Sequence, residues 1–420
     1  MPTTYGASVT IDELTFRPFT REEQPKALDL LYRAFGDSVS DADREDEMLV
    51  LDHRSSHAAF DGDQMVGSLA AYGHDISVPG GEVATAGTTG VAVAPTHRRR
   101  GILSRMMGAH LDEAREKGRA IAALWASEAA IYGRFGYGMA VEQHGIDIIA
   151  GPGLRWAATA PPQADRIRLL EVDRAADVIA PIYEAARARR GGMAARDRGW
   201  WKFQVLSTRK GAMGGAAWKR VAIAEIDGRD VAYAVYGTSE GQLDGLPDNT
   251  LHVIELAGVD AAAEASLWPF LSSHDLVGRV KAKRRPVDDA LPLLVEESRR
   301  VRRHVSDALY VRILDVEAAL TARAWSDSAA VTIEVHDSRF DDIDGTWRIE
   351  VAPEGASVQH TTDAPDLRMD IRELGALYLG GVSVSRLVQS GRIEVLEPSV
   401  VAPFDSALRP AEAPWAPEVW

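Results

Sequence analysis

The stretch that decides the fold is residues 91–104, Val91-Ala92-Val93-Ala94-Pro95-Thr96-His97-Arg98-Arg99-Arg100-Gly101-Ile102-Leu103-Ser104. Val91 and Val93 alternate with small residues, which predicts a strand, and Pro95 marks its end because proline cannot donate to a sheet ladder. A basic loop follows and ends at Gly101. Beyond it, apolar residues recur at helical spacing, namely Ile102, Leu103, Met106, Met107 and Leu111. The stretch therefore predicts a strand, a tight turn and a helix.

This order of parts favours capture of an anion. Backbone N–H groups at a helix N-terminus have no intrahelical partner, and together with the helix dipole they favour a phosphate. Gly101 lets the backbone approach a ligand closely, and Arg98, Arg99 and Arg100 supply positive charge. The natural occupant is a pyrophosphate. The alternative is a solvated basic helix start that binds nothing, because basic residues are common at surface turns.

A second stretch, residues 127–138, helps to decide between a pyrophosphate site and a basic helix start that binds nothing. It reads Ser127-Glu128-Ala129-Ala130-Ile131-Tyr132-Gly133-Arg134-Phe135-Gly136-Tyr137-Gly138 and follows a predicted strand, residues 120–125. The pattern Arg98-x-x-Gly101-x-Leu103 resembles the acetyl-CoA loop of GNAT N-acetyltransferases, although Leu103 departs from the usual glycine or alanine. Taken together, residues 91–101 and 131–138 resemble the Eis family of these enzymes.

The resemblance extends along nearly the whole chain and implies an α/β (α+β) fold in three parts. Turn-forming residues at 151–153 and 160–162 mark the first boundary. The parts are an N-terminal GNAT domain over 1–151, a second GNAT-like domain over 152–303, and a sterol carrier protein-like domain over 304–420. In the second domain Val259-Asp260-Ala261 stands where the phosphate loop would be, so that domain is expected to lack the cofactor site.

Composition excludes several classes of function. The 420 residues carry a net charge of −15, which disfavours a nucleic-acid partner. The chain has no cysteine, which rules out disulfides, thiolate metal sites and cysteine nucleophiles. The eleven histidines show no ligand spacing, so no metal is expected. No signal peptide and no membrane span are evident, and the expected location is cytoplasmic, without membrane association.

The resemblance implies acetyl-CoA as cosubstrate and distributes its binding over three segments. The strand at Val91, Ala92 and Val93 would pair with the pantetheine arm as another strand would. The loop and helix start would hold the pyrophosphate. Further contacts would come from the end of the next strand. The loop and strand-end residues are Arg98, Arg99, Arg100, Gly101, Ile102, Leu103, Ser104, Ser127 and Glu128.

The resemblance also assigns the chemical roles. Tyr132 would be the general acid, since a phenol with an ordinary pKa of about 10 is protonated at neutral pH and can donate to a thiolate. The α-carboxylate of Trp420 would be the general base. Its ordinary pKa of about 3.3–3.7 is low for that task, so burial, a relaying water or simple attraction of the ammonium must help.

Three residues are carried over as the acceptor pocket, namely Phe35, Asp37 and Glu418. Gly90 stands where the resemblance implies an aromatic residue, which predicts a roomier pocket. The tail at 410–420 holds two tryptophans in its last six residues, Trp415 and Trp420. Disordered segments are poor in aromatic residues, so the tail is expected to be docked.

Three functions remain open from the sequence. The first is N-acetylation of a polycationic small molecule, a polyamine such as an aminoglycoside, at several positions. The second is Nε-acetylation of lysine in a protein or peptide. The third is a non-catalytic acetyl-CoA sensor or a lipid-binding scaffold. Assembly as a homohexamer is expected from the resemblance alone.

Overall fold

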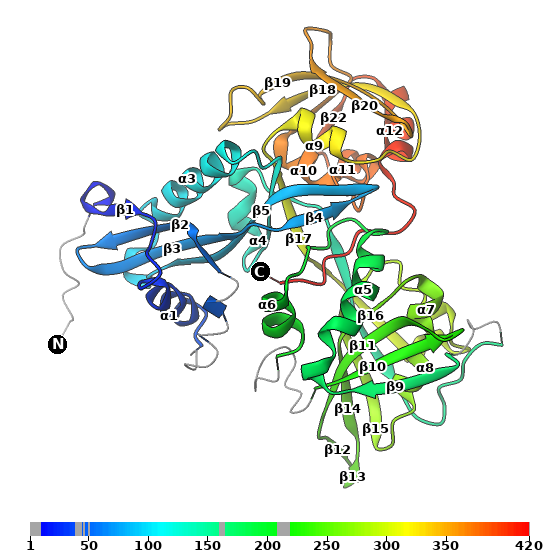
Figure 1. Cartoon of the computed structure of the whole chain (residues 1–420). Helices are drawn as coiled ribbons and strands as arrows, with labels where there is room; N and C mark the ends of the chain where they lie inside the picture. Colours follow the sequence, from blue (N-terminus) through cyan, green and yellow to red (C-terminus); the bar gives the residue numbers. More distant parts are fainter. Residues whose placement is uncertain are drawn as a thin grey trace.

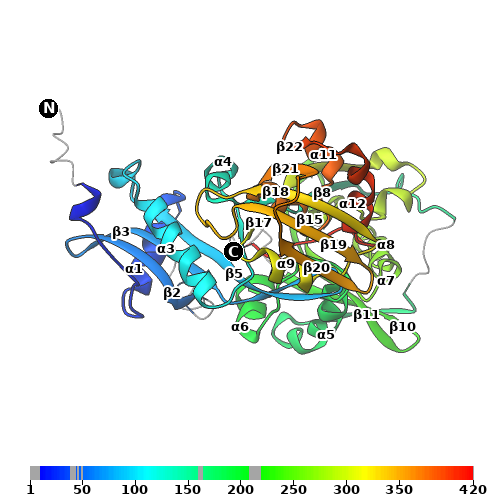
Figure 2. The same ribbon diagram turned by 90° about the horizontal axis from the view of Figure 1, so that it is seen from above.

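The structure is a computed structural model, and it describes residues 10–37, 44, 47–48, 51–158, 164–207 and 219–419. The chain forms three sheet-centred units, which Figure 1 shows in blue to cyan, green, and yellow to red. The third unit lies beside the other two, and the C-terminus ends near the middle of the molecule in both views (Figures 1 and 2). The expected α/β fold in three parts is therefore present.

The first sheet has the strand order β1-β2-β3-β5-β6-β17-β7, with β4 paired to β5. Residues alternate between its two faces, as the pleat requires. Ala58 and Phe60 pack on the side of α1, whereas Ala59 packs on the side of α3. The elements are β1 (Thr15–Arg17), α1 (Gln24–Ala34), β2 (Asp52–Asp61), β3 (Gln64–Tyr72), β4 (Asp75–Val78), β5 (Gly81–Val93), α3 (Ile102–Glu116), β6 (Ile121–Trp125), α4 (Ala129–Tyr132), β7 (Gly138–Met139) and β17 (Leu309–Ile313).

The second sheet has the order β16-β8-β15-β14-β11-β10-β9. Residues 261–272 form two short helices, α7 and α8, which are divided at Leu267, two residues before Pro269. The elements are β8 (Glu142–Ile149), β9 (Arg166–Leu170), α5 (Ala176–Arg187), α6 (Arg198–Trp200), β10 (Lys219–Ile226), β11 (Arg229–Ser239), the hairpin β12 (Gln242–Leu243) and β13 (Leu246–Pro247), β14 (Asn249–Gly258), α7 (Ala261–Ser266), α8 (Trp268–Ser272), β15 (Val277–Pro286) and β16 (Val301–Asp307).

The third unit is a smaller sheet of order β20-β19-β18-β21-β22, flanked by short helices. Its α10 packs on β17 and β7 of the first sheet. The elements are α9 (Val316–Ala322), β18 (Ala329–His336), β19 (Gly345–Ala352), β20 (Gly355–His360), β21 (Leu367–Asp370), α10 (Ile371–Leu377), α11 (Val384–Gln389), β22 (Ile393–Val395) and α12 (Val401–Leu408).

The sheets do not follow the boundaries expected at 151/152 and 303/304. The strand β8 precedes the first boundary but pairs with β15 and β16 of the second sheet. The strand β16 crosses the second boundary, and β17, from beyond it, lies between β6 and β7 of the first sheet. An apolar pattern predicts that a strand exists but not which strand it pairs with. The sequence therefore could not show that β8 and β17 pair with strands of a neighbouring domain.

The tail is docked, as its tryptophans indicate. Trp415 is 1% exposed and packs against α5 and β14. Its backbone N–H donates to the carbonyl of Gly191 at 2.8 Å. In the part of the chain that the structure describes, no helix combines the length and the apolar character needed to cross a membrane.

Candidate active site

The basic loop forms the turn that the sequence predicts. It leads from β5 into α3 with two residues in the left-handed region, Arg99 at φ 62° and Gly101 at φ 82°. Gly101 is the N-cap of α3, and no side chain caps the N–H groups of the first turn. A helix N-terminus that no side chain closes can receive an anion, so the backbone fits the phosphate groups of acetyl-CoA.

The side chains of the loop divide into solvent-facing and inward-facing ones. Arg98, Arg99 and Ser104 are exposed, and Arg100 donates to the carbonyl of Thr96 at 2.9 Å. Leu103 is half-buried. The Ile102 side chain packs in the core against Gly67, so this residue can offer a ligand only its backbone N–H. The arginines therefore remain the source of positive charge beside the helix start.

The strand β5 has an open edge before it reaches the loop. Its parallel pairing with β6 runs only from Thr85 to Gly87, whereas its pairing with β3 continues to Val93. From residue 88 onward the β6-facing edge is free to accept another extended chain. The register with β3 also shifts here, and Gly90, at φ 60°, lies within the shift. Val91 thus lies with Gly90 in a bulge, and Ala92 and Val93 follow it on an open strand edge, which suits an extended pantetheine arm.

Tyr132 lies at the end of α4, close to the end of β6. Burial raises the pKa of its phenol and Glu128 raises it further, against the opposing effect of a hydrogen bond with Ser127. Ser127 and Glu128 are themselves exposed. A phenol with a raised pKa keeps its proton at neutral pH, which a general acid requires.

A buried hydrogen-bond chain lies behind Tyr132, and sequence reasoning missed it. The Tyr137 ring meets the Tyr132 ring edge-on, with 6.2 Å between the centroids. The Tyr137 hydroxyl is 2.9 Å from the Thr88 hydroxyl, which is 2.8 Å from Nε2 of His110 on α3. The chain joins the Tyr132 loop to β5 at the point where β5 leaves β6. The alternating pattern of β5 shows no signal for Thr88, because its partners come from distant segments.

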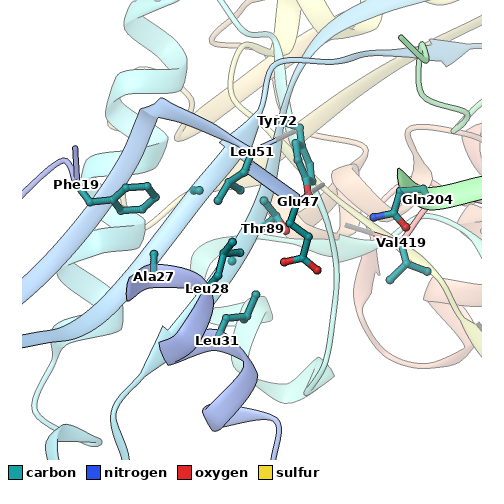
Figure 3. A pocket seen from close by; sticks show the side chains of 12 residues that line it. Phe19, Ala27, Leu28, Leu31, Glu47, Leu51, Tyr72, Thr89, Gln204 and Val419 are labelled. Atoms are coloured by element: carbon teal, nitrogen blue, oxygen red, sulfur yellow. The ribbon is translucent and has the colours of Figure 1, made fainter. Parts of the chain in front are cut away.

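A cavity of about 150 Å³ lies on the α1 side of the first sheet. Figure 3 shows its labelled side chains, with Ala27, Leu28 and Leu31 of α1 to the left, Glu47 near the centre, and Gln204 and Val419 to the right. Most of the wall is apolar, and Glu47 is its carboxylate. The cavity is lined by Phe19, Ala27, Leu28, Leu31, Glu47, Leu51, Ala70, Tyr72, Thr89, Gly90, Gln204 and Val419.

Two of the residues expected in the acceptor pocket lie elsewhere. Phe35 is 61% exposed at the end of α1, and Asp37 is exposed in the following turn. Neither lines the cavity. The acidic side chain that lines the cavity is Glu47, which lies with Asp37 in one acidic segment, residues 37–47, and Tyr32 donates a short hydrogen bond to it. The acidic composition of residues 37–47 does not by itself show which member turns inward.

The third expected pocket residue, Glu418, is buried outside this lining. Its carboxylate pairs with Arg196 at 2.7 Å, so it anchors the tail and does not face the cavity. Trp420, the expected base, lies outside the described residues. Its neighbour Val419 does line the cavity, together with Gly90 of β5. The described tail therefore leads to the cavity wall.

No metal site emerges from the described ranges. Within them, no three histidine, aspartate or glutamate side chains gather closely enough to hold a metal ion. The candidate site consists of the start of α3, the open edge of β5, the buried phenol of Tyr132 and the cavity lined by Glu47.

Comparison with known proteins identifies the three units. Family models describing an acetyltransferase (GNAT) domain match residues 15–140 and 192–313, and a sterol carrier protein domain model matches residues 316–417. An uncharacterized N-acetyltransferase of Streptomyces avermitilis is 39% identical over 93% of this chain and 95% of its own length. The second GNAT match starts at residue 192, well after the boundary expected from the turn residues.

Two Eis proteins are also similar. The N-acetyltransferase Eis of Mycobacterium tuberculosis is 32% identical over 82% of this chain and 83% of its own length. The crystal structure of Eis1 from Mycobacterium abscessus superposes with a TM-score of 0.82 at 30% identity, covering 97% of this chain and all of that one. GNAT acetyltransferases use acetyl-CoA. With two GNAT domains followed by a sterol carrier protein domain, the chain belongs to the Eis family of GNAT N-acetyltransferases.

Proposed function

We propose that this N-acetyltransferase transfers the acetyl group of acetyl-CoA to amines of polycationic small molecules, such as aminoglycosides. The observation that carries the proposal is the cavity that Gly90 of β5, the carboxylate of Glu47 and the tail residue Val419 line together. It connects the open edge of β5 with a negative charge and with the end of the chain.

The chain's own residues divide the work of binding the cosubstrate. The N–H groups of the first turn of α3 would receive the pyrophosphate, and Arg98, Arg99 and Arg100 would balance its charge. The edge of β5 at Val91–Val93 would hold the extended arm. When bound, acetyl-CoA supplies an activated thioester. Ser127 and Glu128, exposed at the end of β6, would border that arm.

The acceptor's amine is an ammonium ion at neutral pH. Glu47 attracts it into the cavity, and the net charge of −15 favours approach of a polycation. The chain-end carboxylate of Trp420, one residue beyond the cavity wall, would accept the amine proton. The Tyr132 hydroxyl holds the proton that the leaving thiolate requires, because its raised pKa keeps it protonated.

A lysine side chain is the second candidate acceptor. The apolar part of the wall, at Leu28, Leu31 and Leu51, suits a single aliphatic arm that ends in one ammonium. A polycation with several amines would instead leave most of its charge outside the cavity. The two candidates therefore differ in how many acetyl groups one acceptor takes up.

The test measures CoA release with a panel of aminoglycosides, linear polyamines and lysine peptides, and counts acetyl groups per product by mass. Several acetyl groups on one aminoglycoside support the proposal. Acetylation confined to peptide lysines favours the second candidate. Removal of Trp420 should leave acetyl-CoA binding intact and abolish turnover. Turnover that survives this deletion would exclude the chain-end carboxylate as base.

A further inference from the structure

A buried ion cluster in the second domain holds the tail beside the cavity. The Arg196 guanidinium, 1% exposed, pairs with Glu255 through two hydrogen bonds of 2.8 and 2.7 Å. The same guanidinium contacts Glu418 of the tail, with Nη2 at 2.7 Å and Nε at 2.9 Å from Oε1. Glu255 is 5% and Glu418 0% exposed, so one cation joins a strand to the tail in the interior.

Aromatic residues complete the cluster. The Arg196 guanidinium lies 3.7 Å above the Tyr183 ring and 4.6 Å from the Trp201 ring. The Tyr183 hydroxyl donates to Glu418, and the Tyr233 hydroxyl donates to Glu255 at 2.5 Å. Despite burial, the pKa of Glu255 is lowered by Arg196, and the pKa of Arg196 is raised by Glu255 and Glu418. Glu255 and Arg196 are therefore held in their charged forms.

A second anchor fixes the tail three residues earlier. The Trp415 indole N–H donates to the carbonyl of Arg284 at 2.6 Å. Arg284 lies beyond Ala282, the last residue of β15 that pairs with the parallel strand β14 at Val253. The tail thus sits where β14 and β15 diverge. The first domain diverges in the same way between β5 and β6 and leaves that edge open.

The anchors constrain the chain end strongly. Val419 follows Glu418 directly and lines the cavity. One residue spans at most about 3.6 Å, so a fixed Glu418 also limits where Val419 can lie. Buried ion pairs add little net stability but are well suited to fixing a register, because an unpaired buried charge is costly. Here the ion pair with Arg196 fixes which residue of the tail lies at this point, namely Glu418.

We propose that Arg196 is the positioning residue for the chain end, and that the second GNAT domain serves the active site of the first by seating the tail. This inference rests on the proposed function, because it takes the Trp420 carboxylate as the proton acceptor. Arg196 acts through Glu418 and touches neither cosubstrate nor amine. The strand divergence that receives acetyl-CoA in one domain receives the protein's own C-terminus in the other.

Glu418→Gln is the first test, because it keeps the shape of the side chain and leaves the Arg196–Glu255 pair intact. We expect kcat to fall by about 10- to 100-fold, since a displacement near 1 Å has that effect, while the Kd for acetyl-CoA is unchanged. The remaining turnover should rise steadily with pH, because the amine must then lose its proton to solvent. Hydrogen exchange at 411–419 should become faster.

The matched control is Glu412→Gln, which removes the other tail carboxylate, paired with Arg189 and Arg190 at 3.2 and 3.0 Å. It should leave kcat and its pH profile unchanged. Arg196→Lys should restore part of the activity that Arg196→Met loses. The double variant Arg196→Met/Glu255→Gln is measured with them, so that an unpaired Glu255 does not decide the result.

The Trp420 deletion distinguishes two hypotheses, that the chain-end carboxylate is the proton acceptor and that Arg196 positions it. If the deletion abolishes turnover and Glu418→Gln leaves kcat and its pH profile as in the wild type, the role of Arg196 is refuted and the proposed function stands. If the deletion leaves turnover unchanged, the chain-end base is refuted, and the positioning role is refuted with it. Loss of turnover in both variants, with acetyl-CoA binding retained, supports both.

Discussion

The two GNAT domains share a strand divergence but treat the following helix in opposite ways. In the first domain, Gly101 caps α3 without a side chain, and arginines surround the opening. In the second domain, the Asp260 carboxylate caps α7 by accepting from Ala263 at 2.7 Å. The first helix start can therefore receive a phosphate, whereas the second already carries a negative charge.

The gap between the diverging strands differs as well. In the second domain Arg285 of β15 reaches across to the carbonyl of Leu256 on β14. Its other nitrogens pair with Glu264 and Asp289 at 2.6 and 2.7 Å. In the first domain Thr88, the first residue of β5 beyond its pairing with β6, turns to His110 and Tyr137. We infer that this scaffold serves as a cofactor site where the gap is open, and as a support for the tail where ion pairs fill the gap.

The largest effect should come from Tyr132→Phe. The loop after β15 in the second domain reads Val287-Asp288-Asp289-Ala290 and has no tyrosine, so a phenol at this place distinguishes the first domain. Loss of a general acid should lower kcat by about 10²- to 10⁴-fold with acetyl-CoA affinity retained. Steady-state kinetics and calorimetric titration measure the two quantities. Tyr137→Phe, a variant of the adjacent buried ring, should lose far less, and equal losses would contradict the assignment.

Arg285→Met should be the strongest structural perturbation of the filled gap. It leaves Asp289 buried without its cation and Glu264 with only the more distant Arg189 at 3.7 Å, which costs about 3 kcal/mol of unfolding free energy. Burial already raises the pKa of Glu264, so the loss should be smaller at pH 5 than at pH 8, where the orphaned carboxylate must stay charged. Urea denaturation at both values measures it. Arg155→Met removes an exposed pair with Glu296 and should change stability by less than about 1 kcal/mol.

Gly101→Asp gives the first domain the capping residue type of the second. The carboxylate would close the N–H groups of α3 and repel a pyrophosphate, so the Kd for acetyl-CoA should rise by about 100-fold. Gly118→Asp is the matched control, because Gly118 also has a positive φ of 68° but lies at the other end of α3. Unchanged affinity in Gly101→Asp would remove the helix start from the binding site.

The smallest effect concerns pH and His110, the buried group at the open gap. Burial, with His57 and Lys117, lowers its pKa to about 3. The unfolded chain takes up a proton near pH 6.5, whereas the folded chain resists it, so stability falls as pH decreases below 6.5. Between pH 6.5 and 5.5 His110 should account for roughly 1 kcal/mol. His110→Gln should flatten this part of the denaturation profile, and His336→Gln, at an exposed site, should leave it unchanged.

Much of the proposed acetyl-CoA site could be predicted from the sequence, because its residues lie close together along the chain. The residues from Val91 to Ser104 are consecutive, and a strand, a left-handed glycine and a helix start follow from their types alone. Tyr132 also stands in a contiguous motif. The acceptor side could not be read in this way, since Glu47, Gly90, Gln204 and Val419 come from four distant segments. The sequence does not show that Glu47 and not Asp37 lines the cavity, because both belong to one acidic segment, residues 37–47.

The sequence by itself determined the fold class, the family and the docking of the tail, since these depend on composition, short-range pattern and contiguous motifs. Only the tertiary structure decided which strands share a sheet, as the insertion of β17 between β6 and β7 shows. It also decided that Glu418 serves as an anchor for the tail, because the charge that neutralises it comes from Arg196, more than two hundred residues away in the chain. Pairing of strands and pairing of buried charges are long-range choices, and packing, not local propensity, makes them.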